Sequence, residues 1–182
     1  MRIIASEMVT LDGFFSGPNG ELDWFVQDEE VDKFANAQLD SVDAILYGRK
    51  TYQMMAGYWP RASGSFAEKT NRLPKLVLTS TLAETPWGEW DNTNPVKGLL
   101  ADEIAKLKEK PGRDIVIYGS GSVVQALSRL GAIDEYRLVV NPVLLGAGRP
   151  LFDGLAERRD LRLIESVAWP SGCVALTYHT AT

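Results

Sequence analysis

Two short turns, each following an apolar run, combine glycine with small hydroxyl or basic side chains. The first turn consists of Gly48, Arg49, Lys50 and Thr51. The second turn consists of Gly119, Ser120, Gly121 and Ser122. Glycine lets a phosphate approach the backbone where a Cβ would block it, and the free N–H groups at the start of a following helix attract anions. The two turns therefore indicate a phosphate-binding site, although each turn alone is also compatible with a plain tight turn.

A third apolar run ends in hydroxyl side chains, those of Thr79, Ser80 and Thr81. If the three runs are parallel strands, their carboxyl ends meet at one edge of a sheet, where α/β proteins bind ligands. The cationic pair Arg49 and Lys50 beside hydroxyls suits a pyrophosphate and a ribose 2′-phosphate, with solvated surface charge as the alternative. The second turn does not complete the G-x-G-x-x-G fingerprint, because Val124 takes the last glycine position. A standard Rossmann fold is therefore disfavoured.

The elements that must position these turns alternate between strand and helix up to residue 131. Apolar runs predict strands at residues 3–9, 44–47, 76–78 and 114–118, and helical spacing predicts helices at 28–39, 49–55, 100–107 and 121–130. After residue 132 the pattern predicts only strands, at 135–141, 161–167 and 173–179. Long loops are expected at 57–73 and 80–98. We therefore expect a single domain spanning residues 1–182, a three-layer α/β/α fold whose central mixed sheet is mostly parallel with antiparallel C-terminal strands.

The composition narrows the class of protein further. The chain has 182 residues with 19 Lys and Arg against 24 Asp and Glu, a formal net charge of −5. This balance argues against nucleic acid or anionic membranes as partners, which require clustered positive charge. No apolar run approaches the roughly 20 residues that cross a bilayer. The single cysteine, Cys173, fits a reducing, cytoplasmic location, and no thiolate cluster for a metal is expected.

The order of these motifs resembles the dihydrofolate reductase-like superfamily. The resemblance is greatest to its riboflavin-biosynthesis branch, the reductase domain related to the C-terminal half of bifunctional deaminase-reductases. The matching stretches are Thr10-Leu-Asp-Gly13, Gly48-Arg-Lys-Thr51, Leu76-Val-Leu-Thr-Ser80, Ile117-Tyr-Gly-Ser-Gly-Ser122 and Asn141-Pro-Val-Leu-Leu-Gly-Ala-Gly148. The resemblance covers nearly the whole chain, without a deaminase domain. It implies an NADPH-dependent reductase that forms a homodimer.

The resemblance also implies roles for individual residues. The turn at 48–51 would contact the cofactor phosphates, residues 79–81 would lie near the adenosine ribose phosphate, and the turn at 119–122 would hold the pyrophosphate. Thr10 and Trp24 would border the nicotinamide and the substrate. Folate reductases bind the pterin ring with an acid on the first helix. Counting back from Gly48 without gaps places Asp32 near that position, and the acids at 28–30 are close enough to compete with it.

Hydride transfer requires no protein nucleophile, which agrees with the absence of an evident Ser-His-Asp or Cys-His set. The proton would come from water oriented by Asp12 or Asp32, although Asp12 in an Asp-Gly pair is equally typical of a turn. Arg61, in the first long loop, could contact a substrate phosphate. Three classes of function remain open. The first is an NADPH-dependent reductase of a small heterocyclic or sugar-linked substrate, either an aminouracil of the riboflavin pathway or dihydrofolate. The others are a non-catalytic NADPH-binding protein and a dimer scaffold.

Overall fold

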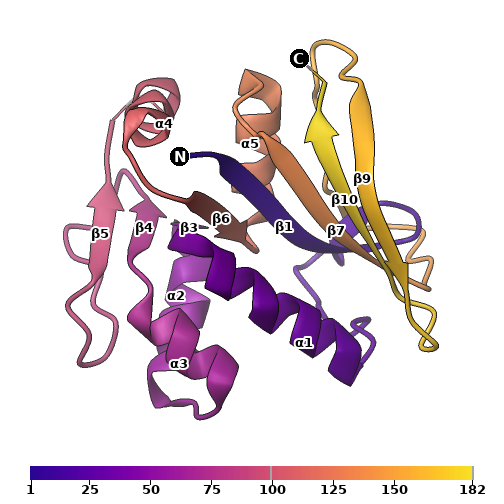
Figure 1. The fold of residues 1–182 in the computed structure, drawn as a ribbon, viewed down its shortest axis with the longest axis horizontal. Coiled ribbons are helices and arrows are strands. Elements are labelled where there is room, and N and C mark those ends of the chain that lie inside the picture. Colours follow the sequence, from indigo (N-terminus) through magenta and orange to yellow (C-terminus); the bar gives the residue numbers. More distant parts are fainter. Residues whose placement is uncertain (99, 182) are drawn as a thin grey trace.

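The computed structural model describes residues 1–98 and 100–181. Its main sheet has eight strands in the order β5-β4-β3-β6-β1-β7-β10-β9, with β5 at one end and the β9–β10 pair at the other (Figure 1). The six strands from β5 to β7 are parallel, and β10 and β9 add antiparallel pairings. The strands are β1 (Ile3–Thr10), β3 (Val42–Gly48), β4 (Lys75–Leu78), β5 (Thr93–Val96), β6 (Asp114–Tyr118), β7 (Glu135–Asn141), β9 (Leu161–Ala168) and β10 (Val174–Thr180).

Helices cover both faces of this sheet. They are α1 (Glu29–Gln38), α2 (Arg49–Tyr58), α3 (Ser65–Arg72), α4 (Leu100–Glu109) and α5 (Gly121–Leu130). Because side chains alternate along a strand, Ile3 of β1 packs with Leu127 of α5, whereas Ile4 packs on the other face with Leu39 and Trp87. The predicted fold class is confirmed. Among the described residues, none of the helices has the length and apolar character needed to cross a membrane.

Helix ends follow the capping chemistry of the sequence. Asp28 caps α1 by accepting a hydrogen bond from the Glu30 N–H at 2.8 Å, in agreement with a helix that begins near residue 28. Gly131 ends α5 in the left-handed region with φ of 66°, directly after the predicted helix end at residue 130. Helix α1 therefore begins, and helix α5 ends, close to the predicted position.

The two expected long loops contain more structure than predicted. The first holds a short 3-10 turn, η2 (Trp59–Arg61), and then α3, and the second holds β5. Helix α3 buries Ala67, Thr70 and Asn71, so its inner face has too few apolar residues for a helical pattern to show in the sequence. Strand β5 has only four residues and includes a proline, which is tolerated because it is an edge strand. A small second sheet pairs β2 (Phe14–Ser16) with β8 (Arg149–Pro150).

Candidate active site

The two glycine turns lie in direct contact. Strands β3 and β6 are parallel neighbours in which Leu46 is opposite Ile117, so the chain leaves both strands at the same edge of the sheet. The N–H of Gly48 donates a hydrogen bond of 2.8 Å to the Ser120 Oγ, across 72 positions of sequence. A Cβ on Gly48 would lie only 2.8 Å from the Val123 Cγ2, so this contact requires glycine. The structure thus brings the two predicted phosphate-binding turns together.

The second turn presents free backbone donors at the start of α5. Gly119 and Ser120 have φ of 71° and 74°, which reverses the chain between β6 and the helix. The Ser120 carbonyl accepts hydrogen bonds from the N–H groups of Val123 and Val124. The amides of Gly121 and Ser122 precede these first bonds of the helix, so they remain free to bind an anion. The Ser120 hydroxyl, by contrast, is occupied by Gly48.

The hydroxyl residues at the end of β4, Thr79, Ser80 and Thr81, lie beside the first turn. Strand β4 pairs with β3, and the Arg49 Nη1 donates a hydrogen bond of 3.3 Å to the Thr81 Oγ1. Arg49, Ser80 and Thr81 are exposed, so they can contact a ligand. Thr79 is buried, and its Oγ1 accepts the N–H groups of Thr81 and Leu82 at 3.2 and 3.1 Å. Thr79 therefore holds the turn in shape, and a direct contact with the cofactor stays a prediction.

A cleft of about 400 Å³ opens beside the turns. Polar groups occupy part of its wall, namely Lys50, Thr51, Gly119, Ser120, Gly121, Ser122 and Arg149. The remaining wall is largely apolar and includes Phe15, Leu22, Phe25, Val31, Phe34, Met54 and Met55. A mainly apolar cleft with a few polar groups is typical of a small-molecule site, and flat aromatic walls suit a planar ring. Six of the eight residues of the two turns line this cleft.

An acid that the sequence analysis did not select, Glu7, borders the cleft. Glu7 of β1 is 7% exposed, and its Oε1 has no hydrogen-bond partner among the described residues. Burial raises the pKa of Glu7 to about 8. Gln38, at the end of α1, is 6% exposed, lines the same cleft and also has an unpartnered Oε1. The available signal was a lone acid inside an otherwise apolar strand.

The phenol of Tyr118 also lines the cleft, at the carboxyl end of β6. Burial raises the pKa of Tyr118, and the nearby carboxyl groups of Asp32 and Glu7 raise it further once they are ionised. Tyr118 therefore keeps its proton throughout the neutral range and is a poor acid. Asp32 itself is exposed on α1 and does not line the cleft, whereas its neighbour Val31 does. A catalytic role for Asp32 stays a prediction.

Asp12 ties two loops together away from this cleft. Its carboxylate accepts hydrogen bonds from the Thr10 hydroxyl at 2.6 Å and from the N–H groups of Leu145 and Gly146 at 3.2 and 2.8 Å. The Thr10 hydrogen bond, helped by these amides, lowers the pKa of Asp12. Asp12 is exposed and is not among the residues that line the cleft. The geometry favours a structural role, and orientation of a catalytic water by Asp12 stays a prediction.

The three predicted substrate residues do not line the cleft. Thr10 is buried, and its hydroxyl is used by Asp12 and by the Phe14 N–H. Trp24 is buried with its Nε1 donating to the Glu21 carbonyl, while Leu22 and Phe25 on either side of it line the cleft. Arg61 is exposed in η2. Contacts of these three residues with substrate stay predictions that the cleft does not favour.

The strand order, the antiparallel C-terminal pair and a ligand cleft beside two strand-to-helix turns define a fold of the dihydrofolate reductase-like superfamily. Within that superfamily, the family model of the RibD C-terminal domain matches residues 2–175. The chain belongs to this family, which confirms the resemblance to the riboflavin-biosynthesis branch.

Individual proteins agree with this placement. The YyaP protein of Bacillus subtilis (strain 168) is 38% identical over 181 residues, which cover 98% of this chain and 94% of YyaP. A crystal structure described as a riboflavin biosynthesis protein from Shewanella sp. PV-4 superposes with a TM-score of 0.83 at 30% identity, covering 100% of both chains. Dihydrofolate reductase from Enterococcus faecalis, complexed with NADP(H), gives a TM-score of 0.68 at 18% identity, covering 100% of this chain and 97% of that one. The last likeness shows the fold alone.

Proposed function

We propose that this protein is an NADPH-dependent reductase of a small heterocyclic substrate, of the kind reduced in the riboflavin pathway. The observation that carries the proposal is the contact between the two glycine turns, which places free amides and the basic side chain of Lys50 on the wall of a mainly apolar cleft. Family membership supports the same function. A cytoplasmic location, where a reduced Cys173 is expected, forms part of the proposal.

The residues present suit a dinucleotide phosphate. The amides of Gly121 and Ser122 would bind the pyrophosphate, and a Cβ at Gly119 would already touch the Thr51 Cγ2 at 3.4 Å. Arg49, aligned with the Thr81 hydroxyl, would bind the 2′-phosphate. The dihydronicotinamide, when bound, supplies a hydride. The protein's part is to hold the substrate in the apolar cleft, exclude water there and supply a proton.

The cleft also suits a ring substrate that carries a phosphate. Phe15, Phe25 and Phe34 line the cleft, and aromatic rings there suit a planar heterocycle. Lys50 and Arg149 contribute positive charge to the same cleft and suit a phosphate on an attached sugar. We therefore place a phosphoribosyl aminouracil first and dihydrofolate second among the substrates.

Cofactor choice should depend on Arg49. We expect NADPH to quench tryptophan fluorescence at much lower concentration than NADH. In Arg49→Ala the affinity for NADPH should fall about 10- to 100-fold while that for NADH stays unchanged, because a charge-assisted hydrogen bond to the 2′-phosphate is lost. Arg72→Ala is the matched control, since Arg72 is an exposed arginine of α3 just before the opposite end of β4. Equal losses for both cofactors in R49A would contradict this assignment.

Turnover separates a reductase from a binding protein of the same fold. Each candidate substrate is mixed with NADPH, and the loss of the dihydronicotinamide absorbance is followed. Oxidation with the aminouracil ribosyl phosphate supports the proposal, and oxidation with dihydrofolate alone moves the activity to the second substrate. Tight NADPH binding without oxidation by either compound would favour the non-catalytic binder.

We propose further that the protein forms a homodimer through its C-terminal strands. Leu161 and Leu163 of β9 are 40% and 51% exposed, and β9 is the edge of the sheet. Their partners in register are Thr180 and Tyr178 of β10, so these side chains share one face with Leu176. An exposed apolar face that continues over neighbouring strands is typical of a protein interface.

The dimer should dissociate when charge is placed on that face. We expect Leu163→Glu to halve the mass measured by light scattering, because a buried carboxylate would oppose association. Arg162→Glu is the control, since its side chain lies on the opposite face of β9. A wild-type mass equal to one chain, or an unchanged mass in L163E, would contradict the proposal.

A further inference from the structure

Glu7 lies at the point where the sheet opens. The last pair between β1 and β6 is Ser6 with Tyr118, after which β6 turns away at Gly119. Glu7 is therefore the first residue of β1 without a neighbour on that side, and it borders the cleft while β7 still pairs with it through Leu138. Resting on the proposed reductase function, we infer that Glu7 is the catalytic acid that gives its proton to the substrate as hydride is delivered.

The surroundings of Glu7 keep its carboxyl group protonated and leave it without a hydrogen-bond partner among the described residues. Glu7 is 7% exposed, and its Oε1 has no hydrogen-bond partner among the described residues. Burial raises its pKa to about 8, so the carboxyl holds its proton at neutral pH. The titratable groups that share the cleft are Tyr118 of β6, Lys50 of α2 and Arg149 of β8. None of them forms an ion pair with Glu7 in the described structure, so burial alone sets its charge.

A neutral carboxyl with no protein partner is suited to a ligand that accepts its proton. In the step, the carbon of a substrate C=N bond receives the hydride and the π-electron pair moves to nitrogen. The nitrogen forms a bond to the Glu7 proton, which leaves a carboxylate, and a proton from solvent later restores the acid. NADPH is oxidised to NADP⁺, the C=N bond is reduced to CH–NH, and one proton is consumed overall.

Gln38 narrows the class of substrate. Gln38 lines the same cleft, and its buried Oε1, which has no partner among the described residues, requires a hydrogen-bond donor. An acid that donates and an amide oxygen that accepts together suit a heterocycle in which N–H groups accompany the reducible C=N bond. A dihydropterin has this pattern in its ring, and a ribosylaminouracil has it once the sugar opens to an imine, whereas a simple ketone does not.

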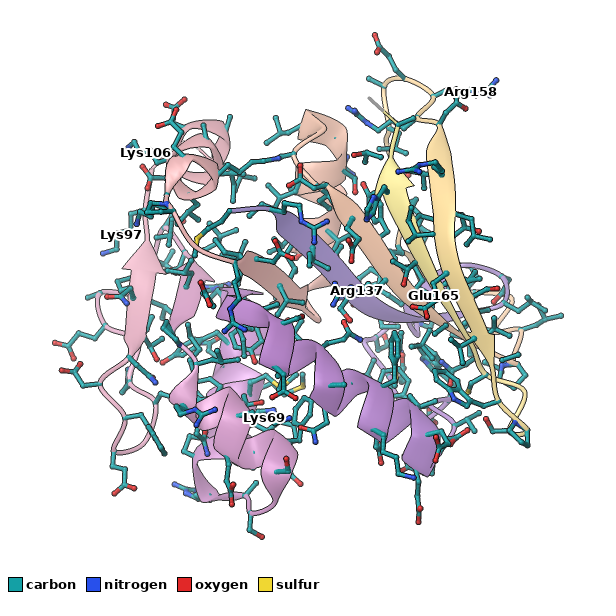
Figure 2. The ribbon with its side chains drawn as sticks, viewed as in Figure 1. Lys69, Lys97, Lys106, Arg137, Arg158 and Glu165 are labelled. Atoms are coloured by element: carbon teal, nitrogen blue, oxygen red, sulfur yellow. The ribbon has the colours of Figure 1, made fainter. Side chains whose placement is uncertain are left out.

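The first test measures the proton on Glu7 without substrate or cofactor. The pKa of Glu7 is raised above its ordinary value of 4.5, so the folded protein binds the proton more tightly than the unfolded chain. Stability contributed by this proton is present below pH 4.5 and is lost as pH rises to about 8. Relative to Glu7→Gln, the wild-type thermal midpoint should therefore fall by roughly 5 °C or more between about pH 5 and pH 8. Glu165→Gln, an exposed acid on β9 (Figure 2), should follow the wild type.

The second test measures the reaction. We expect Glu7→Gln to lower kcat at least about 100-fold with little change in the KM for NADPH, because the acid is lost but the phosphate contacts are not. The wild-type kcat should fall above pH 8, and Glu165→Gln should match the wild type. Glu7→Asp, which keeps the acid on a shorter chain, should restore part of the rate.

The outcomes separate this inference from the proposed function. If E7Q retains kcat while the wild type oxidises NADPH, Glu7 is not the donor and the reductase stands. If the thermal midpoints of wild type and E7Q change by the same amount between about pH 5 and pH 8, Glu7 is not a protonated acid and the inference fails. If the wild type does not oxidise NADPH with any substrate, the proposed function fails and the donor role fails with it, even where the titration of Glu7 is observed.

Discussion

Replacing Gly121 by valine is expected to abolish NADPH binding while the protein remains folded. Gly121 is the first residue of α5, and a Cβ there would lie 2.6 Å from ring atoms of Phe15. Branched methyl groups at this position would cover the amides of Gly121 and Ser122 and keep a phosphate away. Losing two hydrogen bonds to a charged group should reduce affinity by about 100-fold or more. Fluorescence titration with NADPH measures the loss, and circular dichroism reports the fold.

Further variants show whether the loss of binding comes from covering the amides or from displacing Phe15. Gly57→Ala is the control, because Gly57 is a helical glycine of α2 with no atom within 4 Å of its added Cβ. Phe15→Ala removes the ring that a valine would meet, so the Phe15→Ala and Gly121→Val double variant isolates the effect on the ligand. We expect the double variant to remain unable to bind. Recovery of NADPH binding in it would mean that the pyrophosphate does not lie over these amides.

Replacing Trp87 by alanine is expected to lower the free energy of unfolding more than the other substitutions proposed for this protein. Trp87 is fully buried and stacks on Tyr47 with ring centroids 6.0 Å apart. Its Nε1 donates a hydrogen bond of 2.7 Å to the Asn71 Oδ1, and the Lys75 Nζ lies 4.6 Å from its ring centroid. W87A should lower the free energy of unfolding by about 3–5 kcal/mol through the cavity alone. Urea unfolding followed by circular dichroism measures the change.

Trp90 provides a control from the same loop. It forms a short bridge with Trp87 but is 37% exposed, so Trp90→Ala should cost less than about 1 kcal/mol. Trp87→Phe keeps an aromatic ring on Tyr47 but leaves the Asn71 oxygen without its donor, and its loss should be intermediate. Equal effects of the two alanine variants would show that Trp87 does not anchor this loop.

Local chemistry in the sequence determined the order of elements and both turns. Short apolar runs placed the strands, and the helical spacing of apolar residues placed the helices, because these patterns involve only nearby residues. Glycine followed by hydroxyl or basic residues marked the phosphate-binding turns for the same reason. The resemblance to the dihydrofolate reductase-like superfamily rested on the order of these local motifs, and the family match confirms it.

Short or weakly apolar elements could not be predicted from local sequence patterns. Helix α3 and strand β5 form because neighbouring elements cover them, as Phe66 packs beside Trp59 at 4.9 Å between ring centroids. Neither segment has enough apolar residues to predict its own conformation. The pairing of β2 with β8 likewise joins segments more than 130 residues apart, and no local pattern encodes such a pairing.

Only the tertiary structure decided which polar groups meet. The contact of Gly48 with Ser120 depends on β3 and β6 being neighbours, which follows from the strand order of the whole sheet. Asp12 and Thr10 matched a family motif, yet their oxygen atoms are occupied by each other and by loop amides. Glu7 looked like one residue of an apolar strand, but β6 ends beside it and leaves its carboxyl buried at a cleft without a partner. The charge and role of a buried acid depend on what surrounds it in space, and a sequence lists only its neighbours along the chain.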